Sequence, residues 1–303
     1  MDDNARFLDA VSRLPAPAMD DRVAAARERR VLLAELFDSP GDAVVEQREE
    51  VIAGVSVRIF EAAGADGRDA APLVYVHGGG WVAGDPRTHA GICARLARQA
   101  GRTVVSVDYR RPPEHRHPAA VHDVIAVLDA LPAVAALAGD SSGAHVAFEA
   151  AVHRAARPGV RPIDRLVLIQ PACDPAMDRP SWAAFGSGRF LTAAAMRWYW
   201  DEYAGPESAG VLPLWEHDLA GLPPALIILG ALDPLLDEGA ELARRLRDAG
   251  VAVDVVVQPD ALHGSLTMPA AFPAHAGAFT TIAAWIAGGA QRGSTPQKEG
   301  ITA

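Results

Sequence analysis

Short apolar runs alternate with helical stretches along most of this 303-residue chain. Such runs, rich in β-branched residues, are typical of parallel strands that are covered on both faces. They read LVYV, TVVSV, AVAALA, RLVLI, ALIIL and VAVDVVV. Helical stretches separate them, at residues 89–100, 119–131, 144–156, 238–249 and 274–287. This alternation predicts an α/β protein with a doubly wound, mostly parallel central sheet, flanking helices and right-handed crossovers.

Both ends of the chain differ from this central pattern. Residues 1–43 form an N-terminal segment that is predicted to be mostly helical, because apolar residues recur there at helix spacing. Residues 44–61 alternate polar with apolar and are interrupted near Gly54, which predicts two strands joined as a hairpin. Residues 291–303 have the Gly, Ser, Gln and Lys content of a flexible tail.

One connection is much longer than the others. About fifty residues, 174–222, separate two predicted strands, which exceeds the usual link between a strand and a helix. We interpret this insert as a lid. It is rich in large aromatic residues, namely Trp182, Phe185, Phe190, Trp198, Tyr199, Trp200, Tyr203 and Trp215.

Composition and charge exclude several classes of function. The formal net charge is −10 and no run of Lys or Arg exists, so nucleic acid is not an expected partner. Cys93 and Cys173 lie far apart and outside any metal-binding spacing, which argues against a disulfide framework or a zinc site. The opening MDDNARFLDAVSRL differs from a signal peptide, and no apolar run approaches the ~18 residues of a membrane span. We therefore expect a cytoplasmic protein.

A candidate nucleophile lies between a predicted strand and a predicted helix. The segment AVAALAGDSSGAHVAFEAA contains the pattern Gly-x-Ser-x-Gly at residues 139–143. This is the setting of a nucleophile elbow, in which a sharp, strained turn leaves no room for Cβ atoms beside the serine. The turn lifts the serine hydroxyl toward the N-terminus of the following helix. Ser141 is therefore the predicted nucleophile.

A glycine-rich loop, HGGGW at residues 77–81, follows the predicted strand LVYV. Loops of this type form the oxyanion hole of lipases and esterases. Glycine lets the backbone turn its N–H groups inward, toward the oxygen that becomes negative in a tetrahedral intermediate. The predicted donors are the N–H groups of Gly79, Gly80 and Ser142. The alternative interpretation is a flexible glycine turn.

A serine nucleophile needs a base, and the base needs a residue that orients it, in the chain order serine, acid, histidine. Asp233 lies just beyond one predicted strand and His263 just beyond the next. Ligand sites in open α/β sheets form at the carboxyl ends of strands, so both side chains can converge on Ser141. Asp260, three residues before His263, is the alternative acid.

Together these motifs resemble the hormone-sensitive-lipase-like group of α/β-hydrolases, the bacterial family IV esterases with an HGGGW loop and a GDSAG-like elbow. The resemblance extends over roughly residues 40–290. Besides the two motifs above, it includes DYRRPPEHRHPAA at 108–120, DPLLDEG at 233–239 and HG at 263–264.

This resemblance implies the α/β-hydrolase fold with a helical cap. It implies that residues 1–43 contribute cap helices and that residues 44–290 form the catalytic domain, with a cap insert at 174–222. It also implies Asp233 as the acid, and a structural role for His77 in bracing the glycine loop.

Two further residues are predicted to contact substrate. Trp81 stands beside the oxyanion loop. Ser265 follows the histidine and glycine at a position where the group tends to have an aromatic residue, so the substrate preference stays open.

The sequence thus predicts a serine hydrolase that cleaves short-chain carboxylic esters through an acyl-enzyme. Its expected partner is a small-molecule ester, no metal or organic cofactor is required, and a homodimer is compatible with the sequence. One alternative is a deacylase or amidase that acts on an acylated metabolite or natural-product intermediate, since the same triad cleaves both bonds. Another is a non-catalytic small-molecule binder on this scaffold, like the plant gibberellin receptors, which lack the histidine that this chain has at His263.

Overall fold

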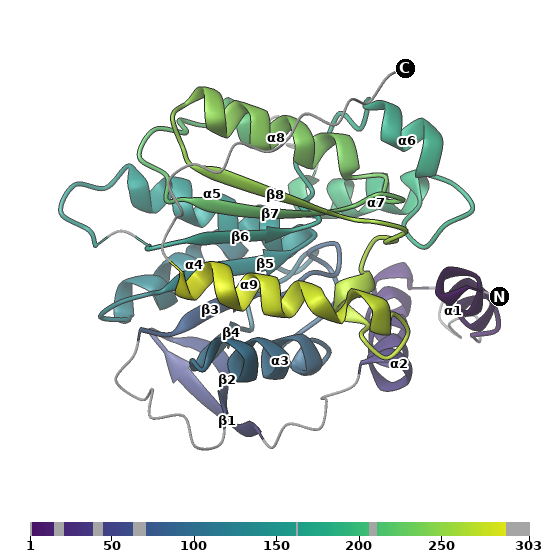
Figure 1. Cartoon of the computed structure of the whole chain (residues 1–303), viewed down its shortest axis with the longest axis horizontal. Coiled ribbons are helices and arrows are strands. Elements are labelled where there is room, and N and C mark those ends of the chain that lie inside the picture. Colours follow the sequence, from purple (N-terminus) through teal and green to yellow (C-terminus); the bar gives the residue numbers. More distant parts are fainter. Residues whose placement is uncertain are drawn as a thin grey trace.

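A central sheet with helices on both faces dominates the structure, a computed structural model that describes residues 2–14, 21–38, 45–62, 71–161, 163–205 and 211–288 (Figure 1). The predicted tail, 291–303, lies outside the described residues. Within them the sheet has eight strands in the order β1-β2-β4-β3-β5-β6-β7-β8. The strands are β1 (Val45–Ile52), β2 (Val55–Ala62), β3 (Leu73–Val76), β4 (Val104–Val107), β5 (Ala136–Asp140), β6 (Leu166–Ile169), β7 (Ala225–Gly230) and β8 (Val253–Gln258).

The predicted hairpin and the predicted parallel strands are both confirmed. Strands β3 to β8 pair in parallel, whereas β2 is antiparallel to both β1 and β4. The hairpin turns at Ala53 and Gly54, where φ is 49° and 82°. Two consecutive positive φ angles match the right-handed twist of a two-residue hairpin, and glycine adopts this conformation without strain. The fold is therefore α/β with a mostly parallel sheet.

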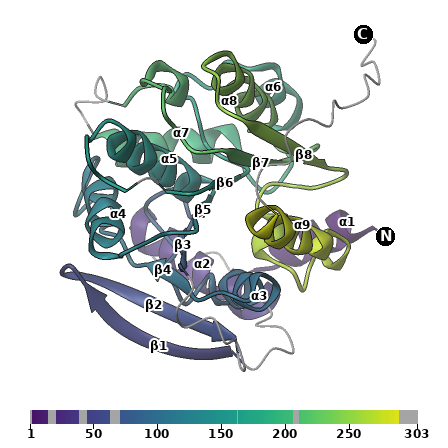
Figure 2. The same ribbon diagram turned by 60° about the vertical axis from the view of Figure 1, so that its left-hand side comes forward.

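Helices on both faces explain why the inner strands are apolar along their whole length. Leu73 and Tyr75 of β3 pack into one buried cluster, and Val74 and Val76 pack into the other, because successive side chains alternate across a sheet. Helices α3 (Ala90–Ala100) and α9 (Gly277–Ala287) cover the first face. Helices α4 (Ala119–Ala130), α5 (Ser142–Ala155) and α8 (Leu236–Asp248) cover the second (Figure 2).

The N-terminal helices pack against segments from the far end of the sequence. Helices α1 (Asp3–Ser12) and α2 (Arg22–Phe37) begin after Asp2 and Asp21, whose carboxylates accept hydrogen bonds from backbone N–H groups of the first turn. The ring of Phe7 lies 4.9 Å from that of Phe272 and 5.2 Å from that of Phe190, centroid to centroid. Figure 1 shows α1 and α2 beyond the ends of β7 and β8.

The long insert is mainly helical in its described part. It contains α6 (Pro180–Phe185), α7 (Ala193–Ala204) and a short 3₁₀ helix at Leu214–Glu216. Four of its aromatic residues are buried in the core cluster, Trp182, Trp200, Tyr203 and Trp215. Of all helices in the described ranges, none is long and apolar enough to cross a membrane.

Candidate active site

The Gly-x-Ser-x-Gly segment forms the sharp turn from β5 into α5 that the sequence predicts. Ser141 has φ 53° and ψ −121°, a strained conformation for a residue with a side chain. A Cβ atom on Gly139 would lie 2.5 Å from the carbonyl oxygen of Gly143. A Cβ atom on Gly143 would lie 2.2 Å from the carbonyl oxygen of Val76. Both glycines are therefore required for the turn.

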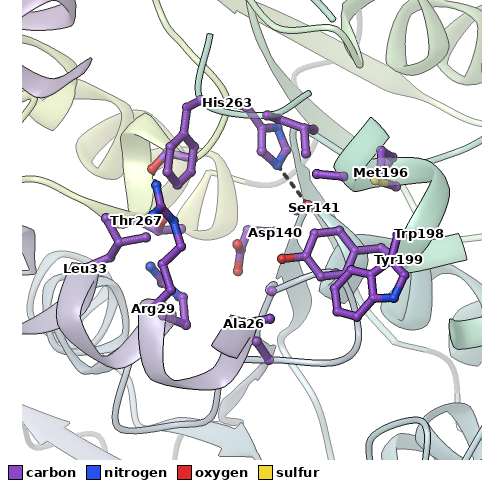
Figure 3. A pocket seen from close by; sticks show the side chains of 18 of the residues that line it. Ala26, Arg29, Leu33, Asp140, Ser141, Met196, Trp198, Tyr199, His263 and Thr267 are labelled. Carbon is purple, nitrogen blue, oxygen red and sulfur yellow. Dashed lines mark hydrogen bonds between the residues drawn. The ribbon is translucent and has the colours of Figure 1, made fainter. Parts of the chain in front are cut away.

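A continuous chain of hydrogen bonds joins Ser141 to His263 and Asp233. The Nε2 atom of His263 lies 2.9 Å from the Ser141 hydroxyl (Figure 3), and its Nδ1 atom lies 2.9 Å from a carboxylate oxygen of Asp233. The other Asp233 oxygen accepts from the N–H of Leu235 at 2.9 Å. A carboxylate on Nδ1 favours the tautomer in which Nε2 accepts the serine proton.

The alternative acid lies elsewhere. Asp260 is exposed, whereas Asp233 is only 1% exposed. The backbone carbonyl of Asp260 accepts a hydrogen bond from Asn4 of α1. The geometry therefore brings together Ser141, His263 and Asp233 and leaves Asp260 at the surface.

The glycine-rich loop lies beside Ser141. Gly79 and Gly80 line the same cavity as Ser141 and have φ angles of 122° and 61°. Within the described part of the chain, no protein acceptor takes a hydrogen bond from the N–H of either glycine. Ser142 is the first residue of α5, where backbone N–H groups are unpaired and the helix dipole is positive. These three residues thus offer donors of the kind that the sequence predicts.

Asp140, which precedes the serine, ties the glycine loop to the sheet. One of its carboxylate oxygens accepts from the hydroxyl of Tyr75 at 2.6 Å and from the N–H of Gly78 at 2.9 Å. Burial alone would raise the pKa of Asp140, but His89, Tyr75 and Arg30 hold it below the usual range. Asp140 is therefore an ionised internal acceptor.

His77 braces the same loop, as the resemblance implies. Its imidazole stacks on the ring of Tyr109 at 4.2 Å, and the Tyr109 hydroxyl donates to the His77 carbonyl at 2.8 Å. Burial lowers the pKa of His77 well below 6.5, which keeps the imidazole neutral.

Gln170 is a supporting residue that no sequence motif indicated. Its amide nitrogen donates to the carbonyl of Leu262 at 3.0 Å, and its amide oxygen accepts from the N–H of Gly264 at 2.8 Å. These two groups flank His263 on either side. Gln170 is 2% exposed and has φ 46°. It therefore fixes the backbone that carries the histidine.

Ser141 and His263 line a cavity of about 310 Å³ (Figure 3). Its walls come from α2, from the insert and from the loops that carry Gly80 and His263. Much of the lining is apolar, including Leu33, Phe190, Leu191, Met196, Trp198 and Tyr199. Tyr199 lies so close to the glycine loop that a Cβ atom on Gly80 would be 2.2 Å from its ring.

The structure corrects the prediction that Trp81 and Ser265 contact substrate. Neither residue lines the cavity, and both are fully buried. Trp81 has φ 61° and its ring stacks on Tyr203 at 4.4 Å and packs on Trp200 at 4.3 Å. Ser265 begins a short 3₁₀ helix. Each residue adjoins the site in sequence, but its side chain packs into the interior.

Candidate metal ligands do not cluster in the parts of the chain that the structure describes: no three His, Cys, Asp or Glu side chains there could hold an ion. Cys93 and Cys173 are free and buried.

The family described as alpha/beta hydrolase fold matches residues 73–267, a range that contains the whole hydrogen-bonded chain. The chain belongs to this family. The carboxylic ester hydrolase LipN of Mycobacterium tuberculosis is 34% identical over 277 residues, which cover 83% of this chain and 72% of the relative. The ethyl acetate hydrolase of Pseudomonas putida is 34% identical over 212 residues, which cover 65% of this chain and 67% of the relative.

Solved structures agree with this assignment. An esterase from the bacterial hormone-sensitive lipase family superposes on this α/β-hydrolase with a TM-score of 0.81 and 26% identity, covering 94% of this chain and 97% of the other. The predicted membership in the hormone-sensitive-lipase-like group is therefore confirmed.

Proposed function

We propose that this hydrolase cleaves short-chain carboxylic esters through an acyl-enzyme on Ser141. As a member of an esterase group, it is a carboxylic ester hydrolase. The observation that carries the mechanism is the chain of hydrogen bonds from Ser141 through His263 to Asp233, with 2.9 Å at each link.

In the first half of the reaction, His263 takes the proton of Ser141 while the serine oxygen attacks the ester carbonyl. The carbonyl oxygen becomes negative and is stabilised by the N–H groups of Gly79, Gly80 and Ser142. His263 then gives its proton to the departing alcohol, and an acyl-enzyme remains.

In the second half, His263 removes a proton from water, and the resulting hydroxide attacks the acyl-enzyme. The intermediate collapses to the free acid, and His263 returns its proton to the departing oxygen of Ser141, which restores the free enzyme. Asp233 stabilises the positively charged imidazole in both halves and keeps it in the required orientation. Its burial and its second hydrogen bond, from Leu235, support this role.

The N-terminal helices and the insert are proposed to form the cap over this site. Residues 1–43 contribute α2, and residues 174–222 contribute α7, and both helices line the cavity. The cap would exclude water from the reacting ester and set the shape of the substrate.

The cavity supports a preference for short acyl groups. Its volume of about 310 Å³ is at the lower end of the range for small-molecule sites. Each added CH₂ contributes at most about 0.8 kcal/mol of transfer free energy until the chain meets a wall. Beyond that length overpacking reverses the trend, so we expect acetyl to hexanoyl esters to be the best substrates.

The test is a series of p-nitrophenyl esters from acetyl to palmitoyl, with p-nitroanilides of the same acids. We expect kcat/KM to peak between acetyl and hexanoyl. Ser141→Ala should retain at most a few per cent of the activity at an unchanged Tm, and the exposed serine variant Ser12→Ala should match the wild type. A peak at dodecanoyl or beyond would refute the short-chain preference, and faster anilide cleavage would favour a deacylase.

A further inference from the structure

Three arginines of α2 line the cavity that contains Ser141: Arg22, Arg29 and Arg30. Among the described lining residues, Asp140 is the one carboxylate, and it is already bound by Tyr75 and Gly78. A cavity with mostly apolar walls therefore has an excess of positive charge along one side. An ester hydrolase acting on neutral substrates has no need of this charge.

Arg30 lines the cavity but is engaged by neighbouring groups of the protein. Its guanidinium donates to the carbonyl of Thr88 at 3.2 Å and lies 3.0 Å from Nε2 of His89. Burial lowers its pKa, and the charges of Asp140 and Asp38 oppose that effect. The charge of Arg30 is thus balanced by internal acids, and Arg30 is not the group that is available to a ligand.

Arg29 is a cavity arginine whose charge is not balanced by any described acid. It is half-buried, and among the described residues it has neither a salt bridge nor a hydrogen bond. Arg27 on the same helix, by contrast, has a bidentate salt bridge with Glu114. Figure 3 shows Arg29 on α2, across the cavity from Tyr199. Its donors are therefore free for a group that enters the cavity.

Arg22 adds a second cation at the same wall. Its guanidinium lies 4.3 Å from the centroid of the Trp198 ring, a contact that orients the arginine and leaves its N–H groups free at the edge. Both arginines act electrostatically on Tyr199, which lines the same wall. Burial raises the pKa of Tyr199, and the charges of Arg29 and Arg22 oppose that rise by favouring the phenolate. The two guanidinium groups therefore reduce the cost of placing a negative charge in this part of the cavity.

We propose that this cavity selects esters that carry a carboxylate, which Arg29 binds while the ester carbonyl lies at Ser141. The inference rests on the proposed esterase function. A guanidinium matches a carboxylate with two parallel N–H donors, and an apolar surrounding strengthens the pair. The reaction is ordinary hydrolysis: water supplies hydroxide to the acyl carbon and a proton to the leaving alcohol, and the bound carboxylate is unchanged.

Two pairs of substrates test the proposal, each pair differing only in charge. Monomethyl glutarate carries its carboxylate in the acyl part, and methyl 5-methylhexanoate is its neutral isostere. 4-Acetoxybutanoate carries its carboxylate in the alcohol part, and 4-methylpentyl acetate is its isostere. The measured quantity is the ratio of kcat/KM within each pair. We expect the ratio to exceed one for at least one pair and to fall as NaCl is added.

The matched variants are Arg29→Gln, Arg29→Lys and Arg98→Gln. Arg98 is exposed at the end of α3 and does not line the cavity, so its replacement changes the net charge equally. Arg29→Gln should lower the preferred ratio by about tenfold, as for loss of a charge-assisted hydrogen bond. Arg29→Lys should retain part of it, because the cation remains without the paired donors. Arg98→Gln should keep the wild-type ratio.

The outcomes separate this inference from the proposed function. If the wild type cleaves neutral esters but both ratios lie at or below one, the carboxylate preference is wrong and the esterase function stands. An equal fall in Arg98→Gln would also overturn it, since the effect would then come from the overall field. If no ester is cleaved and Ser141 is not labelled by a fluorophosphonate, the proposed function itself fails.

Discussion

Gln170 holds the loop that carries His263, and its replacement tests whether that loop limits catalysis. Gln170→Met keeps a similar volume and removes both hydrogen bonds to the residues that flank the histidine. The carbonyl of Leu262 and the N–H of Gly264 would then lose their Gln170 partner in the interior. Each such loss costs about 1–3 kcal/mol, so the free energy of unfolding should fall by roughly 2–6 kcal/mol and Tm by roughly 3–9 °C.

Activity should fall in a way that a general loss of stability does not produce. Gln170 does not line the cavity, so KM should change little. A small displacement of His263 from Ser141 should lower kcat by about 10- to 100-fold. The assay is steady-state hydrolysis of p-nitrophenyl butyrate at a temperature at least 15 °C below each variant's Tm, with thermal unfolding measured in parallel. Gln47→Met, at an exposed position of β1, is the control and should match the wild type in both measurements.

The reasoning would be refuted by a variant that loses stability as stated and keeps wild-type kcat. Gln170 would then stabilise the fold without positioning the histidine. An increase in KM with unchanged kcat would likewise contradict it, because it would show that the loop shapes the substrate site.

Three other perturbations follow from the structure. Asp233→Asn should lower kcat by about 10⁴-fold by favouring the wrong histidine tautomer, whereas Asp260→Asn at the exposed position should change it little; steady-state kinetics decides between the two acids. Burial raises the pKa of Glu238 to about 8 from 4.5, so its protonated form contributes stability that is complete below pH 4.5 and lost as pH rises through about 8. Urea unfolding between pH 5 and 9 should therefore show a shallower decline for Glu238→Gln. Ser265→Phe should lower Tm by overpacking a fully buried position, and an altered acyl preference at unchanged Tm would count against this.

Much of the fold and the central residues of the candidate site could be predicted from the sequence because their signals are local. A strained turn requires Gly139 and Gly143 within two residues of Ser141, so the pattern is visible in the letters. Asp233 and His263 follow the ends of neighbouring parallel strands, and parallel strands bring such ends to one edge of the sheet.

The remainder depends on contacts that have no local signal. Gln170 holds backbone groups 92 and 94 residues away in sequence, and no motif marks a side chain that bonds to distant peptide groups. The sequence predicts a substrate contact for Trp81, and the reason that this prediction is wrong is different. The position of Trp81 beside the loop is evident in the sequence. Its indole turns inward because the backbone has a φ of 61° and the ring stacks on Tyr203, which belongs to the insert.

The packing of Phe7 on Phe272 bears on how this protein is made. Phe7 and Leu33 share a buried cluster with Leu262 and Phe272. A ribosome adds about 5–20 residues per second, so the apolar faces of α1 and α2 wait roughly 10–50 s for the segment on which they pack. During that interval they are surfaces on which a nascent chain aggregates or a chaperone binds. Helix α2, which lines the candidate site, is thus among the earliest parts of the chain to be synthesised and among the last to be buried.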